Sequence, residues 1–193
     1  MSETPTIPIP LGFKAPDFTL PNTVSGKMLN FSQLKGKHGT VVFFICNHCP
    51  YVIHVIDEIV KIAHEYIPKG IHFIAISSND VDNYPQDSPE KMKAHALKWG
   101  FTFPYLYDET QDVAKAYHAA CTPDYNVFDK DDVCLYRGQL DEARPGNDKP
   151  VDGKDLRLAL DCILAHKPIS IKQIPSTGCN IKWKKGNLTL RPL

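Results

Sequence analysis

The sequence predicts one α/β domain in which a mixed sheet is covered by helices on both faces. Short apolar runs rich in β-branched and aromatic residues recur along the chain, and such runs are typical of buried strands. Segments with apolar residues at helical spacing follow several of these runs, and turn residues separate two further pairs of runs. With 193 residues, 42% of them hydrophobic, the chain can bury a core without disulfides. Hairpins flanking an alternating strand and helix region predict the mixed sheet.

The amino-terminal part divides into an arm and a hairpin. Residues 1–11 are rich in proline, so we expect an extended arm without a fold of its own. Residues 15–20 and 28–31 are apolar and are separated by turn-prone residues, which predicts a short β-hairpin. The domain itself is predicted to span residues 12–167.

The middle of the chain alternates between strands and helices. Residues 40–45 predict a buried strand, and an apolar face that starts at Val52 predicts a helix that ends near Pro68. A second buried strand is predicted over residues 71–76, followed by a polar stretch, 77–87, of the kind found at the carboxyl end of a sheet.

The remaining elements follow from caps, turns and helical spacing. Ser88 can cap a helix that ends at Gly100, and Asp108 can cap another that runs through Tyr117. The turn-rich residues 129–132 predict a hairpin. The other expected elements are a strand at 105–107, hairpin strands at 124–128 and 133–137, a surface loop at 141–152, a helix around 156–163 and a packed tail at 168–193.

Composition excludes several classes of function. The 22 basic and 22 acidic residues create no net field that would attract nucleic acid or anionic lipid. No segment has the length and composition of a signal peptide or a membrane span. Two of the six cysteines lie within one helical turn and the other four are scattered, unlike the dense framework of a small secreted scaffold, which indicates a reducing compartment. We therefore expect a cytoplasmic protein without nucleic-acid or membrane partners.

Two cysteines at the end of the strand 40–45 are the main chemical signal. Cys46 and Cys49 are separated by two residues and are followed by Pro50. A thiol at the amino terminus of a helix has a lowered pKa, because unpaired N–H groups stabilise the thiolate. We expect the helix to start near Cys46, which makes Cys46 the predicted nucleophile and Cys49 the more buried resolving thiol.

His48 lies between the two cysteines and can stabilise the Cys46 thiolate. The alternative is a surface histidine without a role. For the cysteines, the alternatives are two buried core thiols or half of a zinc site. The chain has no second Cys-x-x-Cys that would complete a structural zinc site.

A second group of candidate residues precedes the predicted strand 124–128. A cis peptide bond between Thr122 and Pro123 would leave the backbone of Thr122 open to pair with a substrate chain beside the dithiol. Cys121 and Cys179 are possible additional redox thiols. For Cys121 the alternative is a small buried filler.

Residues 12–167 resemble the thioredoxin-fold proteins of the alkyl hydroperoxide reductase and thiol-specific antioxidant group. The resemblance is strongest to a bacterial branch with a Cys-Asn-His-Cys-Pro motif. It rests on residues 15–20, 46–51, 121–124, 144–148 and 178–184. It implies a thioredoxin-like fold with an amino-terminal hairpin and a redox-active disulfide. Thr40 replaces the buried acid of thioredoxin, and Phe43 replaces the threonine that binds peroxide in peroxiredoxins.

The sequence therefore predicts a thiol-disulfide oxidoreductase that cycles a Cys46–Cys49 disulfide through a mixed disulfide on Cys46. Its partner is expected to be a protein or small-molecule disulfide or dithiol, and no organic cofactor or metal is required. The alternatives are a peroxiredoxin-like thiol peroxidase and a soft-metal carrier for copper or zinc. The physiological partner, the direction of electron flow and the oligomeric state stay open.

Overall fold

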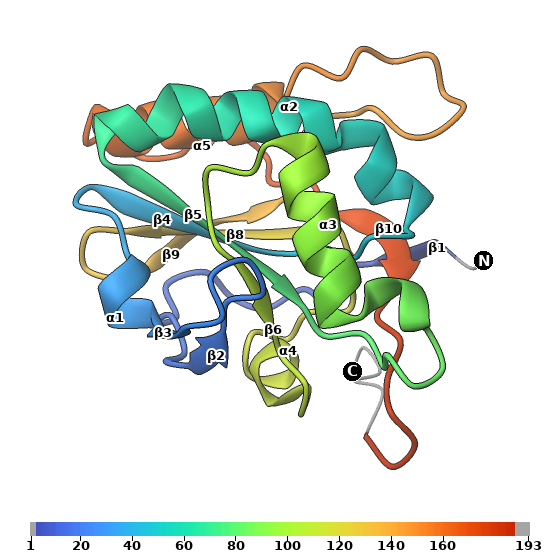
Figure 1. The fold of residues 1–193 in the computed structure, drawn as a ribbon. Helices are drawn as coiled ribbons and strands as arrows, with labels where there is room; N and C mark the ends of the chain where they lie inside the picture. The colour runs from blue at the N-terminus through green and yellow to red at the C-terminus, as the bar shows by residue number, and fades with distance from the viewer. Residues whose placement is uncertain (1–2, 188–193) are drawn as a thin grey trace.

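The computed structural model describes residues 3–187 and is built around a five-stranded sheet in the order β6-β5-β4-β8-β9 (Figure 1). The first three strands in that order are parallel, whereas β4 pairs antiparallel with β8, and β8 with β9. The predicted mixed sheet is thus confirmed. Its strands are β4 (Gly39–Phe44), β5 (Ile71–Ser77), β6 (Tyr105–Tyr107), β8 (Asp124–Asp129) and β9 (Cys134–Gly138).

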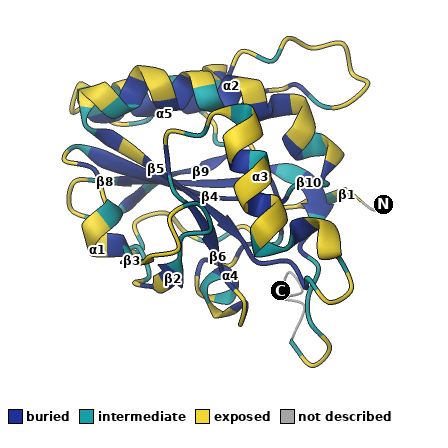
Figure 2. Cartoon of the chain, in the orientation of Figure 1, coloured by how far each residue is buried: buried dark blue, intermediate teal, exposed yellow. Residues whose placement is uncertain are grey.

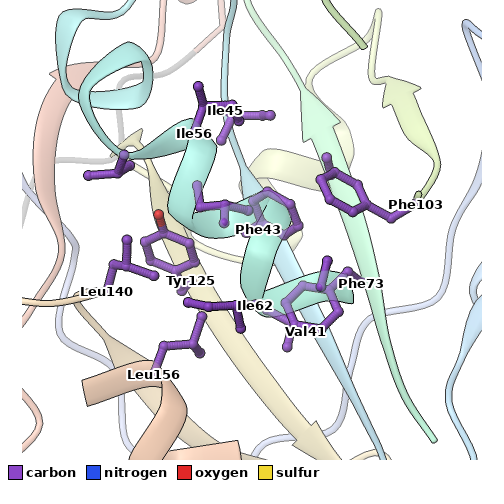
Figure 3. Close-up of a cluster of buried hydrophobic side chains, with 14 of the residues drawn as sticks. Val41, Phe43, Ile45, Ile56, Ile62, Phe73, Phe103, Tyr125, Leu140 and Leu156 are labelled. Atoms are coloured by element: carbon purple, nitrogen blue, oxygen red, sulfur yellow. The ribbon is translucent and has the colours of Figure 1, made fainter. Parts of the chain in front are cut away.

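Alternating side chains of β4 divide the core into two layers, as the two-residue period of a strand requires. Val41 and Phe43 face a cluster with residues from α2 (Pro50–Tyr66), α3 (Pro89–Trp99) and α5 (Lys154–Leu164) (Figure 3). Val42 and Phe44 face the opposite layer. That layer contains the hairpin of β2 (Thr19–Pro21) and β3 (Met28–Asn30), together with α1 (Phe31–Leu34) and α4 (Asp112–Ala116). Figure 2 shows the buried strands between helices whose outer faces are exposed.

The helix boundaries follow from capping groups. The Ser88 hydroxyl accepts a hydrogen bond from Lys91 N at the start of α3, and Gly100 ends that helix at φ 67°, where glycine is favoured. α4 is shorter than predicted, but the Asp108 carboxylate still accepts a hydrogen bond from Ala114 N. The short elements that were not predicted include α1 and the 3₁₀ turns η1 (Ile67–Lys69) and η2 (Pro85–Asp87).

Both ends of the chain contribute to a separate small sheet. Its order is β1 (Glu3–Pro5), β10 (Thr177–Asn180) and β7 (Cys121–Thr122). β1, which lies in the predicted arm, is extended and pairs antiparallel with β10. The ends of the predicted arm and tail, residues 1–2 and 188–193, lie outside the described residues. Within residues 3–187, no helix is both long and apolar enough to cross a membrane.

Candidate active site

The dithiol lies in the turn between β4 and α2. Ile45 N donates to Ile76 O at 2.9 Å, which continues the parallel pairing up to the turn. Pro50 occupies the first position of α2, where its missing N–H has no intrahelical partner in any case. The predicted helix start near Cys46 was wrong, because the N-cap is Cys49. The second cysteine therefore lies at the positive end of the helix.

Both sulfurs contact the residue that precedes the proline. In its thiol form Cys49 donates to Thr122 O at 3.1 Å, and Cys46 Sγ lies 3.6 Å from Thr122 Oγ1. The peptide bond between Thr122 and Pro123 is cis. The fold thus brings Cys46, Cys49, Thr122 and Pro123 together at one site, although they come from distant parts of the sequence.

The pKa values of the two thiols are shifted in opposite directions. The pKa of Cys46 is raised well above its ordinary value, because its thiol hydrogen-bonds to Cys49, because burial disfavours the thiolate, and because the Asp87 carboxylate is near. The pKa of Cys49 is lowered to about 5, chiefly because its sulfur accepts the hydrogen bond from Cys46. The predicted order was therefore wrong: the thiolate of the reduced pair rests on Cys49, the residue at the helix N-cap.

The reduction potential of the pair should change slope near pH 5. Below that pH the folded dithiol holds both protons, whereas above it the Cys49 proton is lost while Cys46 stays protonated. Each proton taken up with two electrons changes the reduction potential by about 30 mV per pH unit. We therefore expect a slope of about 60 mV per pH unit below pH 5 and about 30 mV per pH unit above it. Equilibration with glutathione buffers, followed by alkylation and mass spectrometry, measures both slopes. One slope of about 60 mV up to pH 8 would contradict the thiolate on Cys49.

His48 belongs to a network that borders Cys46. Its Nδ1 atom lies 2.7 Å from Asp87 Oδ2, and its ring stacks on Tyr84 at a centroid distance of 5.8 Å. Asp87 is fully buried, and its carboxylate accepts hydrogen bonds from Asn47 N and Asn79 Nδ2. His48 is therefore held beside the dithiol by a buried acid.

Asp87 is the site residue that sequence reasoning missed. It lies in η2, within the polar stretch that was predicted to follow the strand next to β4. Carboxyl ends of neighbouring parallel strands meet at one edge of a sheet, so this adjacency was the available signal. Nothing in the stretch itself distinguishes Asp87 from the other acids, Asp80 and Asp82.

Three of these residues could hold a metal ion. Cys46, His48 and Asp87 each offer one donor atom, and the three atoms lie within 4.8 Å of one another. A sulfur, an imidazole nitrogen and a carboxylate oxygen form a donor set that suits Zn²⁺. The Asp87 oxygens already accept hydrogen bonds, so a metal would compete with these.

The two further candidate thiols differ in position. Neighbouring residues of a strand face opposite sides, and Thr122 directs its hydroxyl toward Cys46. Cys121 therefore faces away, toward Thr6 Oγ1 at 3.6 Å, and its pKa is raised by burial and by Asp124. The expectation that Cys121 is a redox thiol at the dithiol is not met by this geometry. Cys179, in contrast, lies at the dithiol: its thiol and its backbone N–H donate to the Cys49 sulfur.

The departures from related motifs have structural roles. Thr40, at the position of the buried acid of thioredoxin, accepts a hydrogen bond from Gly36 N through its hydroxyl at 3.0 Å. Phe43, three residues before Cys46, is fully buried in the core. Neither side chain contributes a charge or a hydroxyl to the sulfurs.

The dithiol is covered. Cys46 is 1% exposed and Cys49 is 0% exposed, although an accessible sulfur is needed to meet a partner. His48 lies between Cys46 and a surface groove of about 310 Å³, which is also lined by Asn47 and Gln86. Cys49 is enclosed by Thr122, Cys46 and Cys179. Cys46 is therefore close to a side chain that lines a surface groove.

Comparison with solved structures shows the fold. An uncharacterized conserved protein from Geobacillus kaustophilus is 52% identical, with a TM-score of 0.95 over 97% of this chain and 99% of that chain. A hypothetical protein from Sinorhizobium meliloti 1021 is 43% identical, with a TM-score of 0.93 over 95% and 100% of the two chains. A putative thioredoxin from Neisseria meningitidis is 23% identical, with a TM-score of 0.60 over 78% and 89%. The fold is thus thioredoxin-like, as predicted.

Comparison with family models identifies the group. Curated proteins give no match. The model of the Redoxin family matches residues 10–154, a segment that includes the dithiol and the Thr122–Pro123 bond. This match supports thiol-based redox activity. Because the matched segment covers well over half of its residues, the chain belongs to the Redoxin family.

Proposed function

We propose that this protein is a thiol-disulfide oxidoreductase that cycles Cys46 and Cys49 between a dithiol and a disulfide. The observation that supports this most strongly is the hydrogen-bonded thiol pair at the amino terminus of α2, in contact with Thr122. A pair of thiols in such contact can close a disulfide without a large movement of the backbone.

The contacts suggest an order of steps. The Cys49 thiolate accepts a hydrogen bond from the Cys46 thiol, so it can take the Cys46 proton as Cys46 attacks a partner disulfide. Cys46 then forms a mixed disulfide with one half of the partner, and the other half leaves as a thiolate. Cys49 gives up its proton and attacks the Cys46 sulfur, which closes the Cys46–Cys49 disulfide and releases the second half of the partner.

The reactants in this scheme are a protein or small-molecule disulfide and, for the return step, an external dithiol. A reducing compartment such as the cytoplasm supplies dithiols of this kind. No organic cofactor takes part. Because both sulfurs are buried, the scheme requires that the His48 side chain or the tail moves when a partner binds.

Two measurements test the proposal. The first is turnover of a protein disulfide, with insulin as substrate and dithiothreitol as reductant. The second is the reduction potential of the pair: a value near −270 mV would indicate a reductant and one near −120 mV an oxidant. Failure to form a Cys46–Cys49 disulfide in glutathione buffers, with no insulin turnover, would refute the proposed function.

Peroxide should be a poor oxidant of Cys46. Phe43 stands where peroxiredoxins have the threonine that binds peroxide, and it is fully buried in the core, so no hydroxyl at this position can bind the oxidant beside Cys46. Hydrogen peroxide with a sulfenic-acid trap measures this reaction directly, and diamide oxidation of the same sample is the control. Rapid formation of a Cys46 sulfenate under mild peroxide would favour the peroxidase alternative instead.

Metal binding is a second candidate function, favoured by the donor atoms of Cys46, His48 and Asp87. Titration of the reduced protein with Zn²⁺ against a weak chromophoric chelator tests it. If the site is used, we expect one bound ion per chain, with binding lost in Asp87→Asn and kept in the control Asp82→Asn. Equal retention by the two variants would exclude this site.

A further inference from the structure

The protein's own tail occupies the edge of Thr122 that we expected a substrate chain to use. β10 pairs antiparallel with β7, and Cys179 lies opposite Thr122. A Cβ atom at Gly178 would lie 2.0 Å from Thr122 O, so only glycine allows this close approach. β1 pairs along the other edge of β10. Figure 1 shows β10 next to β1 and near the amino-terminal end of α2.

The same strand presents a thiol to the dithiol. Residues directly opposite each other in a sheet share a face, and Thr122 Oγ1 lies 3.6 Å from Cys46 Sγ. Cys179 faces the same side and hydrogen-bonds to the Cys49 sulfur. Cys49 therefore lies between two thiols, Cys46 and Cys179, and can pair with either.

Burial and the neighbouring Cys49 thiolate keep Cys179 in its thiol form. Burial is the main reason that the pKa of Cys179 is raised to about 12, and the hydrogen bond to Cys49 and the Cys49 charge add to it. Once Cys49 is in a disulfide, it carries no charge and the last two causes are lost. Lys182, whose charge favours a Cys179 thiolate, remains. Oxidation of the pair thus makes Cys179 more reactive.

We propose that β10 is an internal substrate strand and that Cys179 is a third redox thiol, which exchanges with the Cys46–Cys49 disulfide. This inference rests on the proposed function, because that disulfide is its starting point. The Cys179 sulfur attacks Cys49 Sγ, a Cys49–Cys179 bond forms and the Cys46–Cys49 bond breaks. The electron pair of the broken bond goes to Cys46, which takes up the proton that Cys179 gives up. Nothing is oxidised or reduced overall.

The exchange has a consequence for the cycle. It returns Cys46 to the thiol state while Cys49 stays oxidised. It also fastens β10 over the site by a covalent bond. The oxidised protein can therefore rest with the tail attached until an external dithiol releases it.

Disulfide mapping tests the proposal. The full chain is oxidised with oxidised glutathione, quenched in acid, alkylated, digested and analysed by mass spectrometry. In the wild type we expect two products: one peptide with an internal Cys46–Cys49 disulfide, and a linked pair of peptides joined by Cys49–Cys179. In Cys46→Ser the Cys49–Cys179 peptide should become the main product, with the loss of two thiols per chain. The matched control Cys121→Ser, from the strand paired with β10, should map like the wild type.

A second variant tests the proposal even if Cys46→Ser does not fold. Gly178→Val forces β10 away from the Thr122 carbonyl, so it should lose the Cys49–Cys179 peptide and keep the Cys46–Cys49 disulfide. The proposal is overturned if Cys179 stays fully alkylatable in wild type and in Cys46→Ser, while the wild type forms the Cys46–Cys49 disulfide and reduces insulin. That result leaves the proposed function intact. A wild type that neither forms the Cys46–Cys49 disulfide nor reduces insulin would instead refute the proposed function itself.

Discussion

Replacing Cys46 with serine is expected to lower insulin turnover by more than about 100-fold, because an alcohol cannot form the mixed disulfide that begins the reaction. The buried position of Cys49 adds to the effect, since Thr122 and Cys179 cover the remaining sulfur. Turnover with dithiothreitol as reductant measures the loss. Circular dichroism of the variant shows whether the fold is kept.

The partner variant distinguishes the roles of the two sulfurs. Cys49→Ser should also lose turnover, but it should accumulate a mixed disulfide on Cys46, because no neighbouring thiol in the turn resolves it. Mass spectrometry after reaction with insulin or glutathione identifies the adduct and its position. Accumulation of the adduct on Cys49 in Cys46→Ser, with no adduct in Cys49→Ser, would reverse the two roles.

Two other cysteines provide matched controls. Cys134 is fully buried in β9, where burial raises its pKa to about 12, and Cys162 is partly exposed on α5. Neither contacts the dithiol, so serine at either position should leave turnover within about twofold of the wild type. A large loss in these variants would indicate that thiol loss acts through stability rather than through chemistry.

The dithiol and the sheet could be predicted because their signals are local. A run of apolar residues that ends on Cys46 and Cys49 indicates a strand, a turn and a reactive pair within a few residues. The expected elements at 71–76 and 105–107 were confirmed for the same reason. In each case the side-chain pattern and the flanking turn residues agree.

The order of the pKa values could not be predicted, because it depends chiefly on the hydrogen bond between the two thiols, which only the folded geometry shows. The start of α2 could not be predicted either. Proline is tolerated through the first turn of a helix, so Pro50 is compatible with a helix that begins near Cys46 or at Cys49. A shift of the start by three residues moves the positive end of the helix from one sulfur to the other. The position of Asp87 beside Cys46 then adds to the difference.

The positions of the tail and of Cys121 depend on long-range pairing. β10 has four residues, too few for a periodic signal, and its partner β7 has two. The register of that pairing decides whether Cys179 faces the dithiol, because a slip of one residue would place it opposite Cys121, on the other face of the strand pair. Gly178 beside Cys179 was the available sign of a close backbone approach.

A buried ion pair holds the loop that carries Thr122 and Pro123. Arg137 on β9 is 6% exposed, and its guanidinium donates to Tyr117 O and His118 O at 2.8 Å and also to Asn126 Oδ1. Its Nη2 atom lies 3.6 Å from Asp124 Oδ2, and Asp124, the residue after Pro123, is fully buried. Removing this cation leaves the Asp124 carboxylate without its countercharge, although the Thr6 hydroxyl still donates to it, and leaves two backbone carbonyls without this donor.

Arg137→Met should therefore lower the free energy of unfolding by about 3–5 kcal/mol, the usual effect of breaking a buried ion pair. At about 2–4 °C per kcal/mol for a chain of this size, the melting temperature should fall by roughly 6–20 °C. Urea unfolding at neutral pH, followed by circular dichroism, measures the loss.

Arg157→Met is the matched control, because Arg157 pairs with Glu58 and Glu65 at a side-chain exposure of 26%. For that partly exposed group we expect a loss of about 1 kcal/mol or less. In the double variant Arg137→Met with Asp124→Asn, the loss should be smaller than the sum of the single losses, because the carboxylate that Arg137 compensates is gone. Equal losses for Arg137→Met and Arg157→Met would mean that water reaches Asp124 and that the ion pair does not hold the Thr122–Pro123 loop.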